Sequence, residues 1–133
     1  MLFRSIHAVY ADLAENYLAD QTYEAGTVLI FGGEQEVTEC TTYCDARVAG
    51  AVSTNPAYLM NGALENGTAI ALRGRVPVKV IGPVTKGDLL VTSETPGHAV
   101  AVSPNVNYGL AVFAKAIQNK TTDGAGVIEA VIL

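Results

Sequence analysis

The chain has 133 residues, half of them hydrophobic and only 16% charged, with 13 glycines and a net charge of -5. This length suits one domain, which we expect to span residues 1–133 with an entry segment over residues 1–20. The eight basic residues are scattered, so a surface that binds nucleic-acid phosphates is not expected. No apolar run approaches the roughly 20 residues that span a bilayer, so we expect a soluble protein without membrane insertion.

The N-terminal segment is the one stretch whose pattern leaves its secondary structure open. Alanine, leucine and glutamate over residues 3–19 favour a helix, but no capping box begins it. We predict a short turn or an extended entry at Ala11–Asn16. Apolar or alternating runs bounded by turn residues then predict three strands, over residues 23–31, 36–40 and 46–53.

A central stretch over residues 73–100 organises the second half. Val76, Val78 and Val80 alternate with Pro77 and Lys79, which is the period of a half-buried strand. Before it, residues 68–72 read as a strand, and the excursion over residues 56–67 has room for one helical turn at 58–63. Further strands are predicted over residues 89–92, 98–102 and 127–133. The last is so apolar that it must pair within the fold or against another subunit.

A faint internal repeat appears when the chain is compared with itself at a shift of about 60 residues. Residues 25–30 match residues 86–91, and residues 48–52 match residues 108–112. The matches suggest two copies of one β-unit around a pseudo-twofold axis, although any hairpin can look like this. We therefore predict an all-β fold, a compact barrel or sandwich of short strands, and the repeat would favour closure because closure removes exposed strand edges.

The two cysteines, Cys40 and Cys44, admit three interpretations: ordinary thiols, a disulfide, or part of a metal site. A tetrahedral metal site needs four ligands, and His7 and His98 show no ligand spacing, so we favour ordinary thiols. No phosphate-binding loop, dinucleotide fingerprint or calcium loop is present. We expect no metal and no cofactor.

Candidate catalytic residues are few. Ser53 or Ser93 with His98 would supply the residue types of a nucleophilic triad, but neither serine lies in a strand–elbow–helix motif. Asp12 and Glu15 lie three apart, which on a helical turn would place two carboxylates on one side and raise the pKa of one. A solvated face is the simpler interpretation of that pair.

Six blocks that cover most of the chain carry a family likeness. They are Ala11–Tyr17, Tyr23–Leu29, Arg47–Pro56, Gly74–Val80, Lys86–Leu90 and Thr95–Ala99. Together these blocks resemble the C-terminal domain of phage fibre and appendage proteins, particularly virion structural proteins of marine cyanophages. They are also similar to the self-cleaving intramolecular-chaperone domain of phage tail-spike and neck-appendage proteins.

The resemblance implies a β-rich module of the virion that forms a homotrimer, contacts other virion proteins and needs no active site. Trimerisation would bury the strand over residues 127–133 across the threefold axis. In such fibres a long shaft precedes the first block, whereas ten residues precede Ala11 here, so a small virion protein, a cleavage product and a fragment all stay open.

Two alternatives follow from the same likeness. The first is a self-cleaving chaperone domain, for which Asp12, Glu15 and Ser53 are the candidate residues. The second is a tip that binds a carbohydrate or host receptor through exposed tyrosines. The tyrosines considered for that role are Tyr10, Tyr17, Tyr23, Tyr43 and Tyr58.

Overall fold

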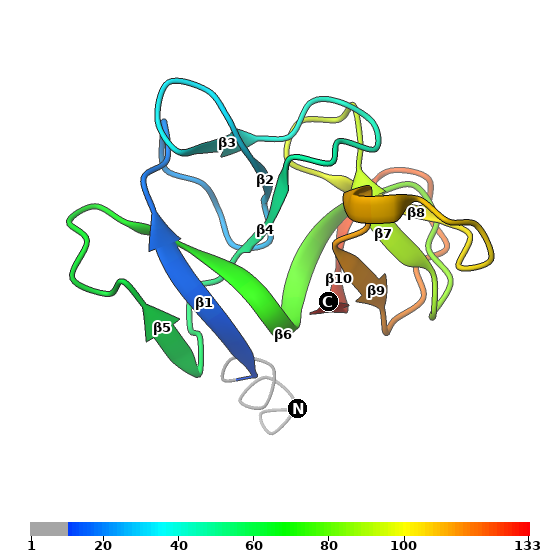
Figure 1. The fold of residues 1–133 in the computed structure, drawn as a ribbon. Helices are drawn as coiled ribbons and strands as arrows, with labels where there is room; N and C mark the ends of the chain where they lie inside the picture. The colour runs from blue at the N-terminus through cyan, green and yellow to red at the C-terminus, as the bar shows by residue number, and fades with distance from the viewer. Residues whose placement is uncertain (1–10) are drawn as a thin grey trace.

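The computed structural model describes residues 11–133 and confirms the prediction of an all-β fold (Figure 1). This part of the chain holds ten strands and one short 3-10 segment, η1 (Gly109–Ala111). The strands are β1 (Asp12–Tyr17), β2 (Val28–Phe31), β3 (Val37–Glu39), β4 (Val48–Val52), β5 (Tyr58–Met60), β6 (Thr68–Ile81), β7 (Leu89–Thr92), β8 (Ala99–Val102), β9 (Ala114–Ala116) and β10 (Ala125–Ile132). Within these residues, no helix is long and apolar enough to cross a bilayer.

Strand β6 is the longest element and belongs to both halves of the molecule. Its first half pairs with β1 and β4, and its second half pairs with β10 and β8. The start of β1 and the end of β10 both reach Gly74, which is paired with Asp12 and with Ile132. Figure 1 shows that β6 turns sharply near this point.

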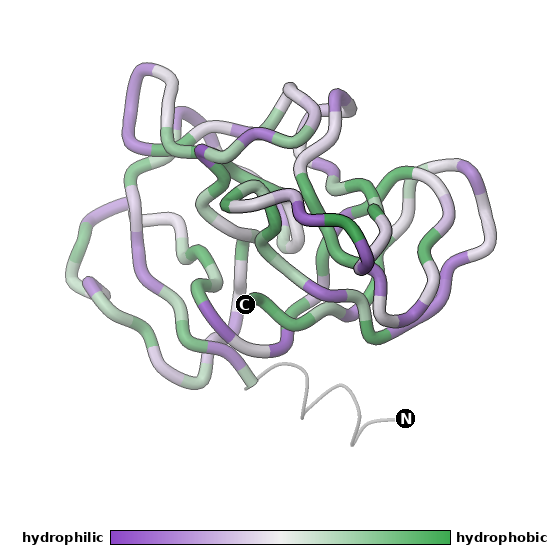
Figure 2. Tube along the Cα trace, turned by 45° about the vertical axis from the view of Figure 1, so that its right-hand side comes forward, coloured by the Kyte–Doolittle hydropathy of each residue, from purple (hydrophilic) through white to green (hydrophobic). Residues whose placement is uncertain are grey.

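The second half of β6 closes a five-stranded barrel through β8, β7, β9 and β10. Val76, Val78 and Val80 are buried as the alternation predicts, and Pro77 and Lys79 are only half-buried. Leu90 on β7, Ile128 on β10 and Phe113, which directly precedes β9, pack with them in the larger core cluster. In Figure 2, hydrophilic residues lie in several of the outer loops.

The first half of β6 carries a smaller lobe made with β1 to β5. Its own core cluster contains Leu29, Val37, Val52 and Ile70. An isolated bridge between Ala19 and Val37 brings β3 back to the end of β1. Strand β5 runs parallel to β1 and, among the described residues, has no strand on its other side.

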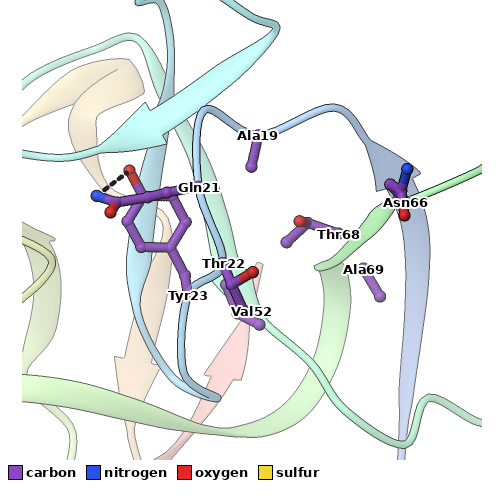
Figure 3. A pocket seen from close by; sticks show the side chains of 9 residues that line it. Ala19, Gln21, Thr22, Tyr23, Val52, Asn66, Thr68 and Ala69 are labelled. Atoms are coloured by element: carbon purple, nitrogen blue, oxygen red, sulfur yellow. Dashed lines mark hydrogen bonds between the residues drawn. The ribbon is translucent and has the colours of Figure 1, made fainter.

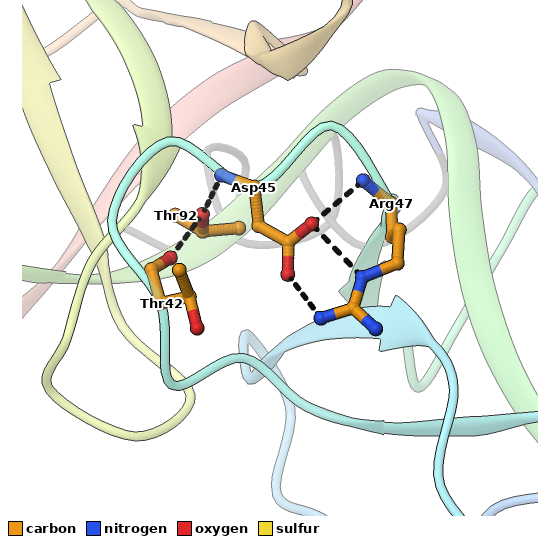
Figure 4. Close-up of polar contacts among 4 residues, drawn as sticks. All are labelled: Thr42, Asp45, Arg47 and Thr92. Carbon is orange, nitrogen blue, oxygen red and sulfur yellow. Dashed lines mark hydrogen bonds and ion pairs between the residues drawn. The ribbon is translucent and has the colours of Figure 1, made fainter.

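A polar junction ties the two lobes together (Figure 4). The Thr92 hydroxyl on β7 accepts a bond of 2.7 Å from the Asp45 backbone N–H and donates one of 2.7 Å to the Thr42 carbonyl oxygen. The Asp45 carboxylate accepts the Arg47 Nε–H at 3.1 Å and the Nη2–H at 2.9 Å. These bonds to Arg47 lower the pKa of Asp45. The loop before β4 is thereby fixed to the barrel.

One open prediction is resolved, and two others need correction. Of the short turn and the extended entry left open at Ala11–Asn16, the extended form is confirmed, since residues 12–17 form strand β1 with Asp12, Ala14 and Asn16 facing inward. The helical turn predicted at residues 58–63 is wrong, because residues 58–60 pair with β1 as β5. The strands predicted at residues 68–72 and 76–80 are one continuous strand, β6.

The proposed internal repeat holds for one pair of segments and fails for the other. Gly26 and Gly87 both adopt positive φ, at 85° and 97°, and precede β2 and β7. However, residues 48–52 form β4, whereas residues 109–111 form η1. The shared pattern in the second pair therefore reflects composition and not a shared backbone.

We predict that Gly74→Ala destabilises the protein far more than Gly82→Ala does. Both glycines adopt positive φ, at 104° and 82°, so both substitutions strain the backbone by about 1–3 kcal/mol. Only at Gly74 would the new Cβ also collide with the Ala11 carbonyl oxygen and lie 2.9 Å from the Asp12 Cα. Urea unfolding of both variants measures the difference, and equal losses would contradict this account of the β6 crossing.

Candidate functional site

A small cavity of about 60 Å³ lies where β1 begins, β4 ends and β6 passes from one lobe to the other. Its walls come from four segments that are distant in sequence. Asp12 and Ser53 are the chemically versatile side chains in it, and the complete lining is Asp12, Ala25, Val52, Ser53, Thr54, Asn55, Val76 and Pro77.

Both polar residues are held by the strands around them. Asp12 opens β1 opposite Gly74, and its carbonyl oxygen accepts the Ala57 N–H at 2.8 Å. Ser53 directly follows β4, and its N–H donates to the Ala69 carbonyl oxygen at 2.9 Å. Because these contacts are made by the main chain, the positions of the two side chains follow from strand register.

The Asp12 carboxyl group is the unusual group of the site. The residue is 4% exposed, and its Oδ2 atom has no hydrogen-bond partner. Burial raises the pKa of Asp12, and the neighbouring Ser53 hydroxyl offsets part of that rise. A buried carboxylate without full hydrogen bonding is costly, so the group holds its proton to higher pH than a solvated aspartate does.

The structure brings Asp12 and Ser53 to one cavity but leaves Glu15 outside it. In a strand, residues three apart point to opposite faces, so Asp12 is buried while Glu15 is half-exposed on the other side. The shared carboxylate face considered for a helical turn is therefore wrong. Glu15 instead contributes, behind burial, to raising the pKa of Tyr17.

The remaining candidates form no catalytic group among the described residues. The Nδ1 atom of His98 lies 2.8 Å from the Pro96 carbonyl oxygen, and Ser93 donates to the backbone carbonyl of His98 and not to its ring. Cys40 and Cys44 are free thiols, and burial raises the pKa of Cys40. Residues 11–133 hold no cluster of three metal-ligating side chains. His7 lies outside the described residues.

A second, larger hollow of about 510 Å³ opens between the segment after β1 and the start of β6 (Figure 3). Of the tyrosines considered for receptor binding, Tyr43 and Tyr58 are exposed on other surfaces, and Tyr10 falls outside the described residues. Tyr17 and Tyr23 are half-buried and not exposed as predicted: Tyr17 packs against Phe31, and Tyr23 lines this hollow. The sequence offered no signal for the rest of the lining, because residues 19–23 and 66–69 meet only through tertiary packing.

We predict that Asp12→Asn flattens part of the pH dependence of stability. Between the usual aspartate value of 3.8 and the raised native pKa, the folded protein keeps a proton that the unfolded chain has released. The free energy of unfolding of the wild type therefore falls as pH rises through this window, and Asp12→Asn removes that fall.

Asp45→Asn is the contrasting variant, because the pKa of Asp45 is lowered and its stabilisation is lost on acidification. Urea unfolding of the wild type and both variants, from about pH 3 to about pH 8, measures how the free energy of unfolding of each depends on pH. If the pKa of Asp12 is raised, the stability of Asp12→Asn relative to the wild type increases as pH rises. A relative stability that does not increase with pH would contradict the raised pKa.

Comparison with known protein families and with characterised proteins finds no match to this chain. Inferences about function therefore rest on the fold, on the cavity around Asp12 and on the sequence blocks described above.

Proposed function

We propose that the chain is a structural module of a phage virion, a β-rich part of a fibre or appendage that serves in trimerisation or attachment. The observation that carries the proposal is the convergence of the blocks on which the resemblance rests. Four of them, Ala11–Tyr17, Tyr23–Leu29, Arg47–Pro56 and Gly74–Val80, each contribute to the lining of the Asp12 cavity. Because these four segments line one cavity, their residues must fit one another. We therefore treat the blocks as one combined sequence pattern and not as four separate ones.

The position of the first and last strands also suits a module of this kind. Asp12 and Ile132 both pair with Gly74, so β1 begins where β10 ends. Any chain before β1 or after β10 would attach at this pole, which leaves the opposite side free for contacts. A module at the tip of a fibre is joined to it on one side only, so its two chain ends should lie close together on that side.

For assembly we propose a surface other than the strand over residues 127–133. Strand β10 pairs with β6 along its whole length and with β9 at Ala130–Ile132, so its C-terminal half has no free edge for a sister copy. Strand β5 has such an edge among the described residues, and its Tyr58 and Leu59 side chains are 65% and 39% exposed. Exposed edges with apolar side chains favour pairing with another chain. We place the contact between subunits at β5.

We expect light scattering to give the mass of a trimer at micromolar concentration, with an interface above about 1,000 Å². Leu59→Lys should lower the mass, because a charge at the centre of the contact is desolvated in the trimer. Leu110→Lys is the matched control, since Leu110 is 86% exposed on η1 and away from β5. A wild-type protein that is only monomeric would refute the trimer.

Self-cleavage is a second candidate function, favoured by the pairing of Asp12 with Ser53 in one cavity. The Ser53 oxygen would add to the carbonyl carbon of a nearby peptide bond as its proton passes to Asp12. The protonated carboxyl group would then give that proton to the leaving nitrogen, which breaks the C–N bond and forms an ester. Water would hydrolyse the ester and restore Ser53.

We expect a carrier protein fused ahead of Met1 to be released by a cut near residue 10, which mass spectrometry would detect. Asp12→Asn and Ser53→Ala should each slow release by about a hundredfold or more. Glu15→Gln, on the opposite face of β1, should release the carrier at the wild-type rate. An intact fusion after days, with and without nucleotide, would exclude this function.

A further inference from the structure

The larger hollow has the size and construction of a ligand site. Its volume of about 510 Å³ falls within the range of roughly 300–1,000 Å³ in which small molecules bind. It lies between two segments, residues 19–23 on one side and residues 66–69 on the other, with Val52 between them. In Figure 3 the hydroxyl groups of Thr22 and Thr68 point toward each other across the opening.

The wall that contains Tyr23 is held in place from behind. Its hydroxyl group donates to Asp20 Oδ1 at 2.5 Å and accepts the Glu39 backbone N–H at 3.3 Å. Thr38 donates to the second oxygen of Asp20 at 2.8 Å, which ties this carboxylate to β3. The Tyr23 ring is therefore fixed before any ligand arrives, and a fixed wall lowers the entropic cost of binding.

The opposite wall is fixed by a reciprocal pair of asparagines. The Asn16 amide donates to the Asn61 carbonyl oxygen at 3.3 Å, and the Asn61 amide donates to the Asn16 carbonyl oxygen at 3.1 Å. A Cβ on Gly67 would lie 2.8 Å from the Asn16 side chain, so this glycine permits the close approach of the loop to β1. Both walls are thus ordered by contacts outside the hollow.

The groups that face the hollow are neutral and able to form hydrogen bonds. Among the lining side chains in Figure 3, one hydrogen bond is drawn, from the Gln21 amide to the Tyr23 hydroxyl at 3.3 Å. The Thr22 and Thr68 hydroxyls and the Asn66 amide make none with the other lining residues. Hydroxyl and amide groups both donate and accept, so together they suit a ligand that carries several hydroxyl groups.

We propose that this hollow binds a neutral saccharide. The lining contains no charged side chain, and the chain has a net charge of -5, so an anionic ligand would find no counter-charge and an unfavourable field. The apolar surface of Ala19, Val52 and Ala69 and the Tyr23 ring can cover the apolar face of a sugar ring, while the hydroxyl and amide groups bond to its edge. A saccharide site here would serve the attachment function proposed above, and its biological role rests on that proposal.

The test is a titration of the isotope-labelled protein, followed by NMR of the backbone amides. Glucose, galactose, mannose and N-acetylglucosamine are the neutral probes, and glucuronate is the anionic probe, each up to about 50 mM, where millimolar affinity would be visible. We expect at least one neutral sugar to shift the amides of residues 21–23 and 66–69. Glucuronate should bind more weakly than that sugar.

Two variants remove ligand groups with little strain on the fold. Thr68→Val deletes one hydroxyl at the start of β6, and Asn66→Gly deletes one amide at a position with φ of 59°, which glycine adopts readily. Each should weaken binding by roughly fivefold. Thr122→Val, in the exposed turn before β10, is the matched control and should leave the affinity unchanged.

No amide shift with any neutral sugar would overturn the inference, as would equal binding of glucuronate or equal effects of Thr68→Val and Thr122→Val. Light scattering on the same samples keeps the proposals apart. A trimer that binds no sugar would refute the saccharide site alone, whereas a monomer that binds sugar would refute the trimer and keep the site.

Discussion

The structure depends on one strand crossing between two lobes. Strand β6 must serve the small lobe with its first half and the closed barrel with its second half, and it changes neighbours at Gly74. At this residue the start of β1 and the end of β10 both pair with β6, and the Ala11–Asp12 backbone approaches so closely that a side chain would not fit. A glycine with φ of 104° satisfies both the turn of the strand and the close approach.

The same crossing determines where polar chemistry is possible. Because Asp12 pairs with Gly74, its side chain enters the space between the lobes, and the end of β4 brings Ser53 to the same cavity. The Asp12 carboxyl group is removed from water, yet its Oδ2 atom gains no hydrogen bond. Most buried polar side chains are hydrogen-bonded, so this group is an exception that calls for an explanation. The larger hollow shows the opposite arrangement: its walls are rigid, and its polar groups remain open to solvent.

Much of this fold could be predicted from the sequence because strand signals are local. The alternation of Val76, Val78 and Val80 and the glycine turns before β2 and β7 were sufficient to predict an all-β fold. The sequence did not show that β5 pairs with β1, because three residues carry no periodicity. The candidate site was predicted in part: Asp12 and Ser53 were named, but Glu15 was grouped with them on helical spacing that a strand does not have. The saccharide hollow joins distant neutral residues, and no local pattern marks them.

The most direct test of this account is the titration of individual aspartate side chains by carbon NMR. If the β6 crossing buries the Asp12 carboxyl group between the lobes, its titration midpoint lies above the usual 3.8, whereas Asp45, bound by Arg47, titrates below it. A midpoint for Asp12 at or below 3.8 would mean that the carboxyl group is solvated or fully paired. The crossing at Gly74 would then not create the site described here.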